Sequence, residues 1–245
     1  AKLLPALVET WSSTRGDGRM EVVARPTSEA FRDLTMGELA AAATSRDANP
    51  SEEEQARAVG VTLDSPDTRH IVAVDVVAIA VHPRNVTESL TYDQVIGIFC
   101  THSIDNWSFL GLDPKPIKVL AREPESGTRA LFEDFFCGPR GIHPSLTVGT
   151  PEEVAAALRD DPDVITFVSL SEGVGKALSL QVDATAPSVR PSQDNIIRGA
   201  YPLYGDRYLF TRGPPVGDMA AFLAWVKSPA GQEVVDEQRF GGVAR

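Results

Sequence analysis

The sequence predicts an α/β fold. Strand signals and helix signals alternate along the chain, which is the pattern expected of α/β architecture. Its 245 residues are enough for one large domain or for two lobes with cores of their own. A hydrophobic content of 42% with 23% charged residues is typical of a soluble globular protein. The sequence has no internal repeat and no low-complexity linker, so two lobes would be joined by crossing strands rather than by a flexible tether.

Caps and apolar runs define the elements of the first third of the chain. Thr27 or Ser28 can cap a helix that Gly37 ends. Ser51 and Glu54 have the spacing of a capping box. The expected elements are, in order, a helix over 2–11, a strand over 19–25, helices over 28–37 and 50–60, and a buried, β-branched strand over 71–82 that His82-Pro83 ends.

The same reasoning extends to the rest of the chain. The expected elements are a helix over 89–100, a strand over 115–122, helices over 128–138 and 150–163, a strand over 164–170, one or two helical turns over 191–199, a strand over 207–212 and a helical segment over 216–238. Ser228-Pro229 should interrupt the last of these helices. Trp107 is expected to anchor a core rather than to stack on a ligand.

Charge and motif content exclude several classes of function. A net charge of −11 argues against nucleic-acid binding, which needs clustered Lys and Arg, but it leaves room for a small anion in a locally positive recess. The four histidines are scattered without metal-ligand spacing, so neither a metal nor a cofactor is expected. The Gly-x-Gly of EGVGK (172–176) lacks the surroundings of a nucleotide-binding loop and is interpreted as a glycine turn. No apolar run reaches the roughly eighteen residues that cross a bilayer, and no signal peptide is visible, although the numbering could begin after one.

The two cysteines leave two interpretations open. Cys100 and Cys137 each close an apolar helical stretch, and they do not form a CxxC pair. They are either two buried thiols or one disulfide between neighbouring helices. The disulfide would require an oxidising compartment.

The stretch VLAREPESGTRALFEDFF (119–136) predicts a strand, a tight turn and a helix with an anion held at the turn. A helix that begins near Gly127 exposes backbone N–H groups, and its dipole places partial positive charge there. Ser126 and Thr128 add hydroxyl donors, and Arg122 offers a planar, charged fork suited to an oxyanion. The alternative is that Ser126 or Thr128 is only a helix cap and that Arg122 is a surface residue. Arg129 is expected to pair with an acid of the turn.

Two neighbouring segments resemble the central signature of the phosphate-binding proteins of phosphate ABC transporters. They are SLTYDQVIGIFCTHSIDNW (89–107) and PIKVLAREPESGTRALFEDFF (116–136). In that family a helix reading LTxxQ…IF, an Asn-Trp pair and an RxxxSGTR turn occur in this order. The resemblance continues through AAATSRDANPSEEE (41–54), HIVAVDVVAIAVHPRN (70–85), DNIIRGAYPLYGDRYLFTR (194–212) and AAFLAWVKSPAGQEVV (220–235), so it covers nearly the whole chain.

The resemblance implies a two-lobed periplasmic binding protein of type II-like fold. Each lobe would be a mixed sheet flanked by helices, with the ligand cleft between them. Lobe I would comprise 1–81 plus 200–245, and lobe II would comprise 82–199. Carried over by position, the residues contacting the anion would be Arg122, Ser126, Gly127 and Thr128 from lobe II, Ser45 and Arg46 from lobe I, and Thr27 and Ser28 at the helix start that corresponds to the family's anion turn.

The implied function is non-catalytic capture of inorganic phosphate for ABC-type uptake. Hinge closure would present the loaded protein, a monomer, to a membrane permease. The implied location is periplasmic or extracytoplasmic, with a lipid anchor as one option. The alternatives are a receptor or sensor for another oxyanion (tungstate, molybdate or sulfate), a phosphatase or transferase that uses the same turn, and a degenerate interaction module on the same scaffold.

Three departures from the family pattern bear on the expected site. The chain begins at Ala1, inside the helix that follows the family's first strand and Gly-Ser-Thr loop. RPTSEAF (25–31) replaces the family's glycine-rich turn and brings Glu29 near it. The turn position that often bears the carboxylate accepting the phosphate proton holds Pro124. The acids nearby that could accept the phosphate proton instead are Glu123, Glu125 and Asp47.

Overall fold

The computed structural model describes residues 2–15 and 20–243. It confirms the predicted α/β class, and the chain forms two compact units. Unit 1 comprises Ala1–Asp75 and Asp206–Arg245, and unit 2 comprises Val76–Gly205. The chain passes between the units within β2 (Arg69–Val81) and within β9 (Tyr204–Thr211). Among the described residues, no helix is long and apolar enough to span a bilayer.

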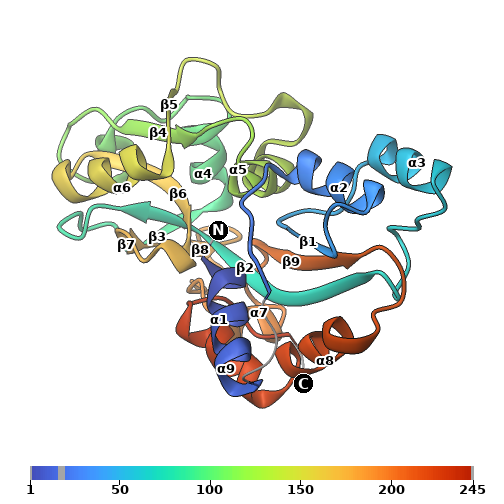
Figure 1. Ribbon diagram of the computed structural model, residues 1–245. Coiled ribbons are helices and arrows are strands. Elements are labelled where there is room, and N and C mark those ends of the chain that lie inside the picture. The colour runs from blue at the N-terminus through green and yellow to red at the C-terminus, as the bar shows by residue number, and fades with distance from the viewer. Residues whose placement is uncertain (1, 16–19, 244–245) are drawn as a thin grey trace. The chain divides into compact units, whose positions relative to one another are not determined.

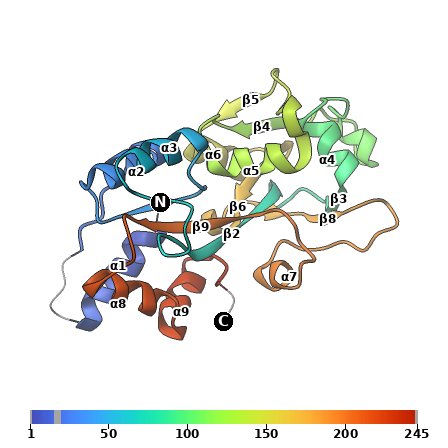
Figure 2. The same cartoon turned by 90° about the vertical axis from the view of Figure 1, so that its right-hand side faces the viewer.

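Unit 1 has helices on both faces of a strand pair. β1 (Ala41–Thr44) pairs antiparallel with β9, with Ala41 opposite Thr211. α2 (Thr27–Met36) and α3 (Pro50–Ala58) lie on one face, and α1 (Leu3–Arg15), α8 (Gly217–Val226) and α9 (Pro229–Glu237) lie on the other (Figures 1 and 2). Phe31 and Phe210 meet edge to face in the first core, and Trp11 packs against Phe222 in the second.

Unit 2 is built on a mixed sheet. The second half of β2 pairs antiparallel with β6 (Val164–Ser169) and with β7 (Lys176–Ala177). β6 is parallel to β4 (Lys118–Arg122), which in turn is parallel to β5 (Thr147–Gly149). A separate parallel pair joins β3 (Ser89–Thr91) to β8 (Ser179–Gln181). Figure 1 shows β5, β4 and β6 in this order.

Side chains alternate between the two faces of β6, as a strand requires. Ile165 and Phe167 belong to the main core of unit 2, whereas Val164 and Val168 pack with residues of α6 on the opposite face.

The helices of unit 2 are α4 (Tyr92–Phe99), α5 (Gly127–Phe132), which continues as a π-helix over Glu133–Cys137, α6 (Pro151–Asp160) and α7 (Gln193–Ile197). Short 3-10 turns occupy Trp107–Leu110, Gly138–Arg140 and Leu170–Glu172. Trp107 is buried in the main core, as predicted.

The structure corrects four local predictions. α2 starts at Thr27 directly after Pro26, and neither Thr27 nor Ser28 caps it with its side chain. Met20–Arg25 form no strand, because no strand pairs with them and Val22 and Val23 face solvent; Arg19 lies outside the described residues. The capping box of α3 uses Asn49 and Glu52, with Pro50 as the first helical residue, instead of Ser51 and Glu54. The segment predicted as a helix over 89–100 begins with β3, and Thr91 caps α4.

Candidate functional site

The turn between β4 and α5 brings four predicted site residues together in unit 2. β4 ends at Arg122, and Ser126 is the N-cap of α5, where its Oγ accepts a hydrogen bond from Arg129 N at 3.3 Å. A second bond, from Ser126 N to Glu123 O at 3.0 Å, closes the turn. Ser126 and Thr128 are buried, and Gly127 between them is half-buried. The predicted strand, turn and helix are therefore present at this point of the chain.

Arg122 is buried and ion-paired. Its side chain is 7% exposed, so the interpretation as a surface residue is wrong. Nε and Nη2 donate to the two carboxylate oxygens of Glu123 at 3.1 and 3.2 Å, and Nη1 donates to Glu172 Oε1 at 3.0 Å. Burial disfavours the charged guanidinium, but the bonds to the two carboxylates outweigh it, and the pKa of Arg122 is raised. The same contact with Arg122 lowers the pKa of Glu123.

Glu172 was missed by the sequence reasoning, which treated its segment only as a glycine turn. Glu172 lies in the 3-10 turn Leu170–Glu172 that follows β6. Because β4 and β6 are parallel neighbours, their carboxyl ends meet at one edge of the sheet, and this brings Glu172 to Arg122. The sequence does place both Arg122 and Glu172 at the end of a predicted strand. Their contact could not be predicted from this alone, because the order of the strands in the sheet was not known.

The remaining predicted site residues lie in unit 1. Arg46 donates to Ser28 Oγ at 3.1 Å and to both carboxylate oxygens of Glu52 at 2.8 and 2.9 Å. The bond to Glu52 is the main cause of the raised pKa of Arg46. Thr27 is the first residue of α2, and Ser45 follows β1, where its carbonyl accepts a 3.5 Å bond from Arg207 Nη1. The structure thus brings Ser28 and Arg46 together within unit 1.

The acids near the predicted turns have different partners. Glu123 pairs with Arg122, whereas Asp47 pairs with Arg69, whose guanidinium also lies 4.5 Å from the centre of the Tyr208 ring. The bond from Arg69 is the main cause of the lowered pKa of Asp47. Glu125 is exposed. The carboxylate that reaches the turn arginine from the turn itself is therefore that of Glu123.

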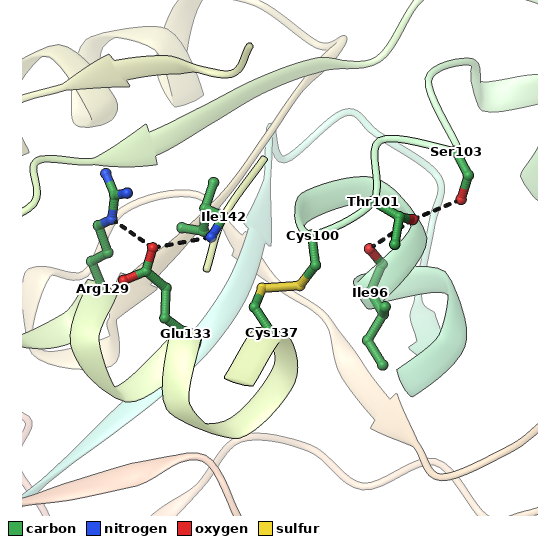
Figure 3. Close-up of a disulfide and its surroundings, with 8 residues drawn as sticks. All are labelled: Ile96, Cys100, Thr101, Ser103, Arg129, Glu133, Cys137 and Ile142. Atoms are coloured by element: carbon green, nitrogen blue, oxygen red, sulfur yellow. Dashed lines mark hydrogen bonds and ion pairs between the residues drawn. A yellow bond between two sulfur atoms is a disulfide. The ribbon is translucent and has the colours of Figure 1, made fainter. Parts of the chain in front are cut away.

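Arg129 pairs with an acid, but not with one of the turn as predicted. Its Nε donates to Glu133 Oε1 at 3.0 Å, one helical turn further on, and its Nη1 donates to the carbonyl of Arg122 at 3.0 Å. Figure 3 shows Arg129 and Glu133 beside the disulfide between Cys100 and Cys137. Of the two interpretations left open for the cysteines, the disulfide is the one that the structure has. In the part of the chain that the structure describes, no three His, Cys, Asp or Glu residues gather into a metal-binding group.

A helix start with hydroxyl groups at the carboxyl edge of a sheet is a place where proteins of α/β fold commonly bind anions. Residues 6–230 match the family described as the PBP superfamily domain, and the chain belongs to this family.

Among curated proteins, the chain is similar to the phosphate-binding protein PstS of Bacillus subtilis, with 29% identity over 160 residues that cover 65% of this chain and 52% of the relative. It is also similar to the phosphate-binding protein PstS of Pseudomonas aeruginosa, with 28% identity over 185 residues that cover 67% of this chain and 56% of the relative. The chain thus spans about half the length of the curated relatives it matches.

Solved structures share the fold over nearly the whole chain. A protein from Clostridium perfringens, described as a phosphate ABC transporter substrate-binding protein with bound phosphate, superposes with a TM-score of 0.80 at 20% identity and covers 99% of this chain and 95% of its own. An ABC-type phosphate transport receptor from Vibrio cholerae superposes with a TM-score of 0.72 at 22% identity and covers 99% of this chain and 96% of its own.

Proposed function

We propose that this chain is a non-catalytic solute-binding protein that captures inorganic phosphate for ABC-type uptake. The observation that carries the proposal is the buried Arg122 beside Ser126, Gly127 and Thr128, in a chain whose relatives are named phosphate-binding proteins. A tetrahedral oxyanion needs several converging donors. Arg122 supplies a charged fork, Ser126 and Thr128 supply hydroxyl groups, and the first turn of α5 supplies backbone N–H groups.

The proposal includes a second set of ligand residues in unit 1, namely Thr27, Ser28, Ser45 and Arg46. Phosphate would use both sets, since a ligand favours a closed state only through contacts that the open state lacks. Closure would be a hinge rotation of lobe I (1–81 plus 200–245) against lobe II (82–199). In each set the arginine is already ion-paired, Arg46 with Glu52 and Arg122 with Glu123 and Glu172, so the anion must compete with these carboxylates.

The proposed partner is the permease of an ABC transporter, and the proposed location is extracytoplasmic. The names of the relatives and of the solved structures support the transport role. The Cys100–Cys137 disulfide supports the location, because structural disulfides persist in oxidising compartments. The function is proposed as non-catalytic because the same relatives are named as binding and transport proteins.

Calorimetric titration with phosphate tests the proposal. The wild type should bind with a stoichiometry of about one per chain, Arg122→Ala should lose nearly all affinity, and Arg46→Ala should bind more weakly, since a charged hydrogen bond is removed in each. Arg140→Ala in unit 2 and Arg57→Ala in unit 1 are controls on exposed arginines and should bind as the wild type does.

Three outcomes would contradict the proposal. Phosphate affinity unchanged in both Arg122→Ala and Arg46→Ala would refute the assignment of these residues. A larger thermal shift with sulfate, molybdate or tungstate than with phosphate would assign the site to another oxyanion. Steady turnover of a chromogenic phosphate ester would show an enzyme instead.

A further inference from the structure

Arg129 ties the two ends of the turn that carries the proposed anion site. Its backbone N donates to Ser126 Oγ at 3.3 Å, and its side-chain Nη1 donates to the carbonyl of Arg122 at 3.0 Å. The first bond holds the start of α5, and the second holds the last residue of β4. Arg129 thus fixes the backbone on both sides of Glu123–Glu125, which determines where the Arg122 side chain and the first amides of α5 point.

Glu133 in turn holds the Arg129 guanidinium. Its Oε1 accepts from Arg129 Nε at 3.0 Å and from the backbone N of Ile142 at 3.1 Å (Figure 3). The space around this carboxylate is small, because a Cβ added at Gly141 would lie 3.3 Å from Glu133 Oε1. Gly141 also has a φ of 65°, which favours glycine. The carboxylate is therefore fixed by a charged side chain, a backbone amide and a close glycine.

The disulfide fixes the helical segment on which Glu133 lies. Glu133 begins the π-helix Glu133–Cys137, and Cys137 ends it in the bond to Cys100 at the end of α4. The loop that supplies the Ile142 amide is held at the same place, because His143 N donates to Phe99 O at 2.9 Å. The Cys100–Cys137 disulfide thus holds the segment that carries Glu133, and Glu133 in turn contacts Arg129, which contacts Arg122.

We propose that Arg129 and Glu133 are positioning residues for the anion site, and that the Cys100–Cys137 disulfide keeps them in place, so that the disulfide-bonded protein binds the anion more tightly than a protein without this bond. This inference rests on the proposed phosphate site. Neither residue needs to touch the anion. Both act by fixing the backbone at Arg122 and at Ser126, so that the donors do not have to be ordered at the moment of binding.

The test uses the full chain with phosphate as the probe and with both cysteines oxidised. Glu133→Gln, which keeps the size of the side chain, should raise the dissociation constant about tenfold, and Arg129→Gln should raise it at least as much. Arg129→Lys should fall between Arg129→Gln and the wild type, since a single ammonium cannot reproduce both bonds of the fork. The double variant Arg129→Gln/Glu133→Gln should be no weaker than Arg129→Gln alone, because the two residues act through one contact.

Two control variants change residues next to Glu133 and Gly141 that make none of the contacts described above. Asp134→Asn lies next to Glu133 on the same π-helix, and Arg140→Gln lies next to Gly141; both side chains are exposed. Each should bind phosphate as the wild type does. If Glu133→Gln binds no more weakly than Asp134→Asn, the positioning role is refuted.

Hydrogen exchange of the ligand-free protein gives a readout that does not depend on phosphate. The amides of residue 123 and of residues 125–130 should exchange several times faster in Glu133→Gln and in Cys100→Ser/Cys137→Ser than in the wild type or in Asp134→Asn. The cysteine variant should also bind phosphate several times more weakly. A wild type that binds no phosphate would refute the proposed function, while unchanged exchange at 123–130 would refute the positioning role by itself.

Discussion

Glu172 Oε1 lies 3.0 Å from Nη1 of Arg122, and the two residues follow neighbouring parallel strands. With Glu123 on the opposite side of the guanidinium, a buried arginine has two carboxylate partners. Removing a charge from water is costly unless it is paired, so these carboxylates stabilise Arg122 in its buried place. They also occupy the donors that an anion would use. The ion pairs of Arg122 therefore stabilise the fold and at the same time oppose the binding of an anion.

Glu172→Gln should raise phosphate affinity several-fold and lower the melting temperature. The amide keeps the shape of the side chain but removes a negative charge that competes for Arg122 and repels an anion. Calorimetry and thermal melts at pH 7.5 measure both effects. Glu152→Gln, on an exposed face of the same unit, is the control for the change in net charge alone. A loss of affinity in Glu172→Gln would mean that Glu172 orients Arg122 for the ligand instead.

Local signals predicted the parts of the fold that depend on near neighbours. The buried strand β2, the end of α2 at Gly37 and the break at Ser228-Pro229 follow from apolar runs, a left-handed glycine and a proline. The segment 20–25 contains β-branched residues typical of a strand, but it pairs with no strand in the part of the chain that the structure describes. The π-helix Glu133–Cys137 has no signature in the sequence.

The candidate site divides in the same way. Arg122, Ser126 and Thr128 were predicted together because they lie within one turn of chain, and the structure places them there. Glu172 and Glu52 were not predicted, because their contacts with the arginines depend on the strand order in unit 2 and on which residue caps α3. That Glu172 pairs with Arg122 and Glu52 with Arg46 follows only from the three-dimensional positions of the strands and helix starts.

Asp75→Asn should destabilise unit 1 by about 3–5 kcal/mol, the usual cost of breaking a buried ion pair. Asp75 is fully buried in β2 and pairs with Arg207 of β9, so the change leaves a largely buried guanidinium without its counter-charge. Denaturant unfolding in a Trp107→Phe background, followed by tryptophan fluorescence, reports on unit 1 through Trp11 and Trp225. Asp64→Asn, which removes an exposed pair with Arg57, should cost about 1 kcal/mol or less. Equal costs for the two variants would contradict the prediction.

His70 should make the stability of unit 1 depend on pH below 6.5. Burial, and to a smaller degree the charge of Lys227, lowers the pKa of His70 from its ordinary value of 6.5. The unfolded chain therefore takes up a proton before the folded one does, so the contribution of His70 is complete above pH 6.5 and is lost as the pH falls toward the lower folded value. The melting temperature should fall between pH 7 and pH 5 in the wild type and fall less in His70→Gln. Carboxylates with lowered pKa values, such as Glu52, act only below their ordinary value of 4.5 and leave this range clear. The same slope in both proteins would contradict the prediction.

Gly231→Ala should destabilise the protein although alanine is the better helix former. In an exposed helix the change would gain about 1 kcal/mol. Here a Cβ at Gly231 in α9 would lie 2.6 Å from the Cα of Val226 in α8 and would also meet the carbonyl of Trp225, and backbone atoms cannot rotate away. We expect a net loss of about 1–3 kcal/mol from overpacking, measured by denaturant unfolding. Gly97→Ala in α4 is the matched test. Its Cβ would lie 2.7 Å from Cδ1 and 2.9 Å from Cγ1 of Ile104, and because these side-chain atoms can move, this variant should cost less than Gly231→Ala. If Gly231→Ala is as stable as Gly97→Ala, the close approach of α8 and α9 is not what requires glycine at this position.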